Sequence, residues 1–324
     1  MIDPNKFGVL LLLTVSFHIL LAYDAPIIGI LSQETFSVNH LFEEEYHSFI
    51  AASYVKYLES AGARVVPILI GKDRQYYVDL VNHTNGILFP GGATYFNQSD
   101  GYADAGQIIY DLALDLNKKG DYYPIWGTCL GMELMIHVAL NGEEVRSHCS
   151  ASKVSMPLNF KEDFRKSKLF SEAPEEIIEI LTNQNVTYNS HQFCLTEETF
   201  TEKNLLQDWT IISTNEDING FPFISTFESK KFPFYAVQYH PEKINFEFRE
   251  KDNIPHSLDA MKTSHYFANF FIEETKKNKH RYPDWNSEMK ALICNYSPHF
   301  TGLKNSSYLQ LYMFKKEQEV INGK

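Results

Sequence analysis

The chain has 324 residues, of which 44% are hydrophobic and 14% aromatic, and its formal net charge at pH 7 is −12. This length and apolar content suffice for a sizeable core, and they fit either one large domain or two modest ones. The acidic balance argues against a nucleic-acid-binding protein, because the faces that bind nucleic acid are basic.

Residues 1–23 have the pattern of a secretory signal. Lys6 gives a basic start, and residues 7–21 are mostly apolar, a run that is short for a membrane span. A retained membrane anchor is the alternative. We expect the mature chain, residues 24–324, to be one domain with no membrane association after signal removal. In an exported chain, glycosylation is expected at exposed Asn-x-Ser/Thr sequons, which begin at Asn82, Asn97, Asn185, Asn295 and Asn305.

Residues 26–140 alternate predicted strands and helices. Short apolar runs predict strands at 26–31, 65–70, 87–89 and 125–128. Apolar residues at helical spacing predict helices at 44–61, 76–81, 102–119 and 132–140. Such an order predicts a mostly parallel central sheet with helices on both faces, which is a three-layer α/β/α fold.

The fourth predicted strand runs into a Gly-Thr-Cys-Leu-Gly corner at residues 127–131, which an apolar helix follows. A nucleophile on such a corner is exposed at the carboxyl end of its strand, and the glycines permit a tight turn and close packing. The N–H groups and the dipole of the helix favour thiolate, the reactive form of cysteine. We therefore predict that Cys129 is a nucleophile with a lowered pKa. A buried cysteine that acts as a small apolar residue is the alternative.

Residues 141–230 break this alternation. Strands are predicted at 186–195, 209–215 and 223–228, and a mixed or antiparallel extension of the sheet fits them best. The charged segment 160–170 is expected to be a surface excursion. A helix with an apolar aromatic face is predicted at 257–277, and the tail beyond it is polar.

A base is predicted far downstream of the cysteine. The apolar run at 234–239 ends in His240, Pro241 and Glu242, and the proline cannot donate to a strand ladder, so His240 falls at a strand end. In open α/β sheets the sites form at the carboxyl edge. We predict that His240 is the base for Cys129 and that Glu242 orients its ring, as the third member of a triad does.

A Gly-Gly loop follows the third predicted strand. The backbone N–H groups of Gly91 and Gly92, together with that of Leu130, are predicted to form an oxyanion hole. Alone, the Pro-Gly-Gly sequence at residues 90–92 would only signal a turn. Its specificity comes from its combination with the cysteine corner and the His-Pro-Glu segment.

Together these motifs resemble class I glutamine-amidotransferase-like hydrolases, and more closely the gamma-glutamyl hydrolase family, also called folylpolyglutamate hydrolases. The likeness spans roughly residues 25–300 and follows the family's motif order. One departure is Tyr239, where tryptophan often precedes the histidine. The matching segments are PIIGIL (26–31), AASYVK (51–56), LFPGG (88–92), WGTCLG (126–131), NSH (189–191) and QYHPEK (238–243).

The resemblance implies cleavage of γ-glutamyl amide bonds in folylpoly-γ-glutamates and antifolate polyglutamates through an acyl-enzyme, without a cofactor. It also implies that His191 binds substrate or stabilises the transition state; a hydrogen-bonded strand histidine is the alternative. Because the substrate is a polyanion, local cations must bind its carboxylates. Lys243 is nearest to the predicted base, and Arg146, Lys153 and Arg249 are alternatives. The family implies a lysosomal (vacuolar) or extracellular location and a homodimer, although no stretch shows a dimer face.

Two other functions would use the same fold. A glutaminase subunit that releases ammonia from glutamine would need the same Cys-His-Glu set, but the export signal and the absence of a synthetase domain argue against it. A secreted non-catalytic binding protein would be expected to lack the nucleophile or the base. With Cys129 reactive, Cys149, Cys194 and Cys294 allow at most one disulfide and one odd thiol. No spacing of cysteines or histidines predicts a metal site.

Overall fold

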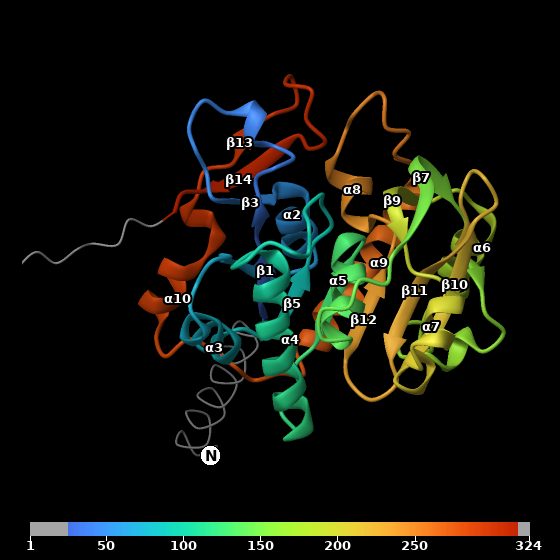
Figure 1. Cartoon of the computed structure of the whole chain (residues 1–324), viewed down its shortest axis with the longest axis horizontal. Helices are drawn as coiled ribbons and strands as arrows, with labels where there is room; N and C mark the ends of the chain where they lie inside the picture. Colours follow the sequence, from blue (N-terminus) through green and yellow to red (C-terminus); the bar gives the residue numbers. More distant parts are fainter. Residues whose placement is uncertain (1–24, 317–324) are drawn as a thin grey trace, which may run out of the picture.

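The computed structural model describes residues 25–316, so the predicted signal at 1–23 lies outside the described residues. An eight-stranded sheet forms the centre of the molecule (Figure 1). Its first five strands are parallel and the last three antiparallel, which confirms the predicted fold class. In spatial order the strands are β4 (Arg64–Ile68), β1 (Ile27–Leu31), β5 (Gly86–Phe89), β6 (Ile125–Thr128), β12 (Phe234–Val237), β11 (Pro222–Ser229), β10 (Trp209–Glu216) and β8 (Asn159–Phe160).

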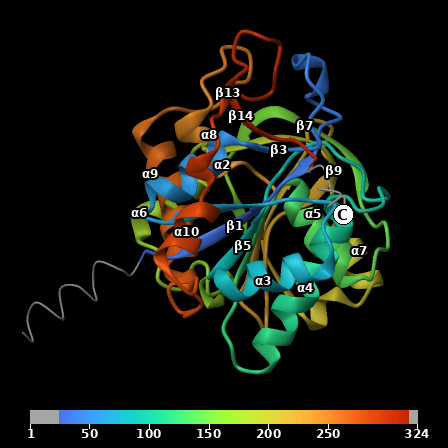
Figure 2. The same ribbon diagram turned by 90° about the vertical axis from the view of Figure 1, so that its left-hand side faces the viewer.

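Helices cover both faces of this sheet, as Figure 2 shows. All five residues of β1 are buried, as expected for a parallel strand between two helical layers. Two hydrophobic clusters fill the two interfaces. One face carries α3 (Arg74–His83), α4 (Tyr102–Lys118), α5 (Leu130–Ala139) and α7 (Glu197–Glu202), and the other carries α2 (Ala52–Ser60), α6 (Glu175–Asn183) and α9 (Leu258–Thr275).

A second, four-stranded sheet corrects the helix predicted at 44–61. Residues Ser48–Ala51 form strand β3, and the helix α2 begins only at Ala52 and ends at Ser60. The reason is a partner that local periodicity does not show, because β3 pairs with β14 (Gln310–Phe314) from the far end of the chain. The sheet is completed by β2 (Gln33–Glu34) and β13 (His299–Phe300).

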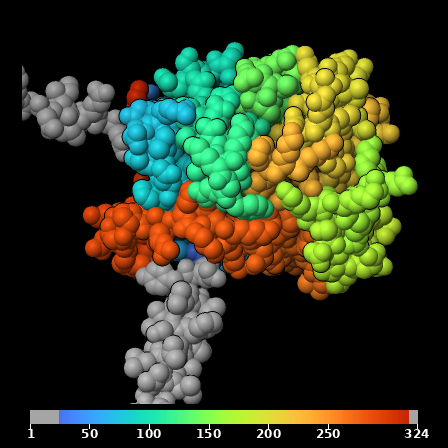
Figure 3. Space-filling model, turned by 90° about the horizontal axis from the view of Figure 1, so that it is seen from below, coloured from blue at the N-terminus to red at the C-terminus, as the bar shows by residue number. Residues whose placement is uncertain are grey.

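The segment after α9 packs against the body of the molecule instead of forming a polar tail. Leu311 and Phe314 are buried in the main core. In Figure 3 the orange and orange-red residues of α9 and of the segment that follows it form a continuous band across one face. The segment 160–170 likewise differs from the expected surface excursion, since Leu169 and Phe170 are fully buried. The segment after α9 also contains α10 (Trp285–Ala291) and the short helix η4 (Ile293–Asn295). Three further short helices lie earlier in the chain: η1 (Asn39–Leu41), η2 (Phe164–Lys166) and η3 (Leu205–Gln207).

A two-stranded sheet of β7 (Ser147–Met156) and β9 (Thr187–Cys194) lies beside the main sheet. A disulfide between Cys149 and Cys194 joins its strands, while Cys294 is free and exposed. One disulfide and one odd thiol besides Cys129 is the predicted outcome. The asparagines of all five sequons are exposed. Within residues 25–316, no helix combines the length and the apolar character that crossing a membrane requires.

Candidate active site

The nucleophile predicted from the Gly-Thr-Cys-Leu-Gly corner lies where β6 passes into α5. Cys129 is the N-cap of α5 and has φ +51° and ψ −110°, a left-handed conformation that costs a β-carbon-bearing residue about 1–3 kcal/mol. The turn is held because the Cys129 N–H donates to the Val237 carbonyl at 2.8 Å. A β-carbon at Gly131 would lie 1.9 Å from the Phe89 carbonyl oxygen. Only glycine therefore permits this helix to approach the sheet so closely.

The predicted base lies at the end of the neighbouring strand. β12 pairs with β6 in parallel, with Val237 opposite Thr128, so the residues that follow both strands reach the same edge of the sheet. His240 begins the helix α8 (Pro241–Phe246). Its Nδ1 lies 2.8 Å from Oε1 of Glu242, and both side chains are almost fully buried. The structure thus places Glu242 where a residue that orients the imidazole must lie.

Gly91 shows how close the cysteine and the histidine are. A β-carbon at Gly91 would lie 2.8 Å from Cε1 of His240 and 3.0 Å from Cβ of Cys129. These two atoms are therefore no more than 5.8 Å apart, the sum of the two distances. The side chains of Cys129 and His240 therefore lie next to each other around Gly91.

Electrostatics in the site oppose the predicted thiolate. Burial raises the pKa of the Cys129 thiol well above its ordinary value, and the carboxylates of Glu133 and Glu242 raise it further. The Leu130 N–H and the Lys243 ammonium act in the opposite direction without reversing the shift. Burial also lowers the pKa of His240, against the effect of Glu242. Both shifts favour the uncharged form of each group, and the direction for Cys129 is opposite to the predicted lowering of the thiol pKa.

The predicted oxyanion donors are not equivalent in the structure. The N–H of Gly91 donates to the Tyr54 hydroxyl at 2.7 Å, so it is occupied within the protein. The N–H of Gly92 has no hydrogen-bond partner in the described part of the chain. The Leu130 N–H points at the Cys129 sulfur. Neither Gly92 nor Leu130 thus donates its N–H to a protein oxygen of the described residues, although the Leu130 N–H interacts with the sulfur, and Gly91 permits close approach.

His191 lies on β9, buried, at the same end of the molecule. Its pKa is lowered to about 3, mainly by burial and next by the charge of His240. This repulsion indicates that the two imidazoles face a common region. Its Nδ1 lies 3.0 Å from the Phe193 carbonyl oxygen and its Nε2 lies 3.2 Å from Oδ1 of Asn189.

Of the predicted cations, only Lys243 lies in the site without an ion-pair partner. Its side chain is 5% exposed, and in residues 25–316 no carboxylate lies within ion-pair distance of its ammonium. The rings of Tyr188 and Tyr308 lie 5.8 and 5.1 Å from Nζ.

The other candidate cations are already paired. Arg146 binds the carboxylates of Glu133 and Glu144. Lys153 and Arg249 both bind Asp252, each at 2.9 Å.

Three residues that surround the pair were missed as site residues by sequence reasoning. The Tyr54 hydroxyl lies 3.4 Å from Nδ1 of His240. Nε2 of Gln238 lies 3.8 Å from the Cys129 sulfur and donates to Glu133 at 3.1 Å. Burial raises the pKa of Glu133 to about 7. Glu133 follows Cys129 by one helical turn, a spacing that could have indicated a position beside the nucleophile.

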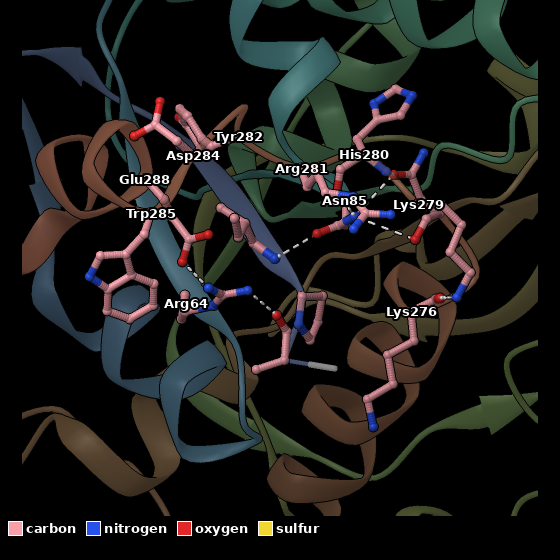
Figure 4. Close-up of a pocket in the computed structure, with 14 residues that line it drawn as sticks. Arg64, Asn85, Lys276, Lys279, His280, Arg281, Tyr282, Asp284, Trp285 and Glu288 are labelled. Carbon is pink, nitrogen blue, oxygen red and sulfur yellow. Dashed lines mark hydrogen bonds and ion pairs between the residues drawn. The ribbon is translucent and has the colours of Figure 1, made fainter. Parts of the chain in front are cut away.

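The cavity shown in Figure 4 lies at the amino edge of the sheet, opposite to the carboxyl edge that holds Cys129 and His240. It encloses about 640 Å³ and borders the amino ends of β1 and β4. Two of its polar residues are engaged within the protein: Arg64 binds Glu288 and the Ala25 carbonyl, and Asn85 binds the backbone of Ile27 and His280 (Figure 4). This cavity therefore lies apart from the cysteine and the histidine.

The fold and this arrangement define a cysteine hydrolase of the α/β class. A match to the Peptidase C26 family covers residues 26–242. Gamma-glutamyl hydrolase B of Dictyostelium discoideum is 40% identical over 293 residues, which are 90% of this chain and 83% of that protein. The gamma-glutamyl hydrolases of Rattus norvegicus and Homo sapiens are each 41% identical, over 89% of this chain and 89% of their own length. The chain belongs to the gamma-glutamyl hydrolase family and is a cysteine-type peptidase.

Proposed function

We propose that the chain hydrolyses γ-glutamyl amide bonds of folylpoly-γ-glutamates, with Cys129 as nucleophile and His240 as general base and acid. The observation that carries this proposal is the meeting of Cys129, His240 and Glu242 around Gly91 at the carboxyl edge of β5, β6 and β12. The names of the relatives support the γ-glutamyl bond as the one that is cleaved.

The proton moves when the sulfur attacks, because both partners rest in their neutral forms. Nδ1 of His240 donates to Glu242, which leaves Nε2 to accept the thiol proton while the S–C bond to the γ-carbonyl forms. The Gly92 and Leu130 N–H groups stabilise the oxyanion, and one such donor contributes about 3 kcal/mol to lowering the barrier. His240 then protonates the departing amine and later activates water, which releases the acyl group from Cys129.

Lys243 recognises a carboxylate of the glutamyl chain. A buried ammonium is costly unless it is closely paired. The Glu247 carboxylate is near enough to attract the ammonium of Lys243 but not within ion-pair distance, so a substrate carboxylate would supply a direct partner. The Lys243→Met variant should raise KM for a polyglutamate about tenfold with a smaller effect on kcat, as expected for one lost charge-assisted hydrogen bond. Lys153→Met is the matched control, because the Lys153 side chain is 47% exposed and its ammonium is already bound to Asp252. Equal effects of both variants would contradict this role.

The reaction is tested by incubating the chain with pteroylpentaglutamate and, separately, with glutamine. Release of glutamate or glutamyl peptides from the first substrate, without ammonia from the second, is the expected result. Ammonia release from glutamine alone would favour a glutaminase. Absence of turnover on both, with tight binding of the pentaglutamate, would favour a binding protein. The lengths of the products separate cleavage at the end of the chain from cleavage inside it.

The same proposal includes export to the lysosome or the extracellular space. The disulfide between Cys149 and Cys194 and the five exposed sequon asparagines support it, because disulfides persist in oxidising compartments. Expression in a secretory cell line should yield a chain whose mass falls on treatment with peptide N-glycosidase. A chain retained in the cytosol without glycans would contradict the export.

A further inference from the structure

Three metal-binding side chains meet next to the active site. Cys149 comes from β7, and His191 and Cys194 come from β9. Their Sγ and ring-nitrogen atoms all lie within 4.8 Å of one another. Nδ1 of His191 lies 3.4 Å from Sγ of Cys149 and 3.5 Å from Sγ of Cys194. Two sulfurs and one imidazole nitrogen are the donor set that zinc prefers.

The second ring nitrogen of His191 is held as it is in metal sites. Nε2 lies 3.2 Å from Oδ1 of Asn189, so the tautomer with the proton on Nε2 donates to this oxygen. Nδ1 also lies 3.0 Å from the Phe193 carbonyl oxygen, to which a proton on Nδ1 would donate. Zinc binding therefore requires the other tautomer, in which the proton is on Nε2 and the Nδ1 lone pair lies within 3.5 Å of both sulfurs. A hydrogen bond from the distal nitrogen to an oxygen is the usual second-shell support of a zinc-bound histidine.

The backbone keeps these ligands together independently of the S–S bond. β7 and β9 are antiparallel, with Ser147 opposite Cys194 and Ala151 opposite His191. An irregularity between His148 and Ala151 shifts the register at Cys149, and such bulges re-aim a side chain. The Cα atoms of the two cysteines are 6.1 Å apart. The strand pairing therefore preserves the cluster when the sulfurs are no longer joined.

The cluster borders a cavity from which a reductant and an ion can reach it. This cavity of about 580 Å³ is lined by Cys149, His191 and Asp217, among others. A zinc ion held by three protein ligands takes a water as its fourth ligand, and the cavity offers space for that water.

We propose that Cys149, His191 and Cys194 form a zinc site when their disulfide is reduced. A dithiol reductant supplies two electrons and two protons to the S–S bond, giving two thiols, and is itself oxidised to a disulfide. Zinc then binds both sulfurs and Nδ1 of His191, and the two thiol protons are released. In the oxidised chain a disulfide cross-links β7 and β9, and in the reduced chain the same two cysteines belong to a metal site.

Zinc at this site takes His191 away from the substrate. This consequence rests on the proposed function, because it requires that His191 contact the glutamyl chain or the transition state. Turnover should therefore be lost when zinc is added to the reduced chain, and be unaffected by the same zinc concentration in the oxidised chain.

The binding is tested with cobalt, which reports thiolate ligation by a sulfur-to-metal charge-transfer band. The full chain is reduced with a phosphine, freed of reductant without oxygen, and titrated with Co²⁺. We expect one Co²⁺ per chain, displaced by Zn²⁺, and no band in the oxidised chain. Cys149→Ser and Cys194→Ser should abolish the band. Cys294→Ser and Cys129→Ala, which remove the other two thiols, should retain it. Asn189→Ala should weaken binding about 10- to 100-fold.

The proposal is overturned if the reduced chain keeps its circular dichroism spectrum but shows no band. It is equally overturned if the band persists in Cys149→Ser, or if reduction alone unfolds the chain, since the site requires the folded β7–β9 pair. Metal binding without loss of turnover would leave the zinc site intact and contradict the role of His191. The two proposals thus fail through different measurements.

Discussion

Replacing Glu242 by glutamine separates the proposed catalytic role of this carboxylate from its effect on stability. Oε1 of Glu242 lies 2.8 Å from Nδ1 of His240, and the two side chains are 1% and 4% exposed. The other oxygen, Oε2, has no hydrogen-bond partner in residues 25–316. Glutamine keeps the shape of the side chain and removes its charge.

The expected loss of activity follows from the hydrogen bond to the imidazolium that forms when His240 takes the thiol proton. A hydrogen bond to a charged group contributes about 1.5–3 kcal/mol. Since about 1.4 kcal/mol corresponds to a factor of ten, kcat/KM should fall between about tenfold and about 150-fold. Removing Glu242 also removes a contribution that raises the pKa of His240, so the acid limb of the pH profile should move to lower pH.

Stability should not fall with activity. A buried carboxylate with one unpartnered oxygen carries a desolvation cost, and neutralising it relieves that cost. We expect the Tm of Glu242→Gln to equal or exceed that of the wild type. Glu228→Gln is the control, because the buried Glu228 accepts from the N–H groups of Lys168 and Leu169 with its two oxygens. This control should lose stability and keep its activity.

The assay is release of glutamate from a pteroylpolyglutamate over a pH series, beside thermal unfolding of each variant. A wild-type kcat/KM for Glu242→Gln would refute the role of the carboxylate. A parallel fall in Tm and activity would instead mean that Glu242 supports the fold around His240.

Cys129→Ala should lower turnover by more than about 10³-fold and keep the fold. Cys129→Gly should be equally inactive. In denaturant unfolding it should be about 1 kcal/mol more stable than the alanine variant, because glycine relaxes the strained φ. His191→Asn should lower kcat by about 10²-fold with an unchanged circular dichroism spectrum, and a wild-type rate would place it outside the site. Gly131→Ala should destabilise the chain by about 3 kcal/mol or more, since its β-carbon would meet the Phe89 carbonyl; an unchanged Tm would contradict the close packing. The acid limb of wild-type kcat/KM should lie below the ordinary histidine value of about 6.5, because burial lowers the pKa of His240.

The parallel half of the sheet could be predicted from the sequence because its signals are local. β1, β5 and β6 are short apolar runs bounded by glycine or proline. Because both faces of each strand are buried, each strand appears in the sequence as a continuous apolar run. The corner at Cys129 and the strand end at His240 could be predicted for the same reason. The strand β3 could not, because its apolar residues also fit a helix and its partner β14 lies about 260 positions away.

Contacts from distant segments explain what sequence reasoning missed in the site. Tyr308 follows the last predicted helix by more than 30 residues, yet it reaches Lys243 because the pairing of β14 with β3 brings the end of the chain over α8. The disulfide between Cys149 and Cys194 depends on the register of two strands, which spacing alone does not fix. Such arrangements become visible only when the tertiary pairing is known.

The state of the nucleophile shows most clearly why local rules were insufficient. The dipole of α5 and the Leu130 N–H do favour a thiolate, as the sequence predicts. Burial of Cys129 and the nearby carboxylates of Glu133 and Glu242 raise the thiol pKa by more than these two features lower it. Desolvating an unpaired thiolate costs more free energy than the end of one helix supplies. In the proposed mechanism His240 therefore takes the proton during the attack. We expect Cys129 to stay protonated in the free enzyme. The thiol proton should pass to His240 only when a bound amide substrate offers its carbonyl carbon to the sulfur and excludes water from the site.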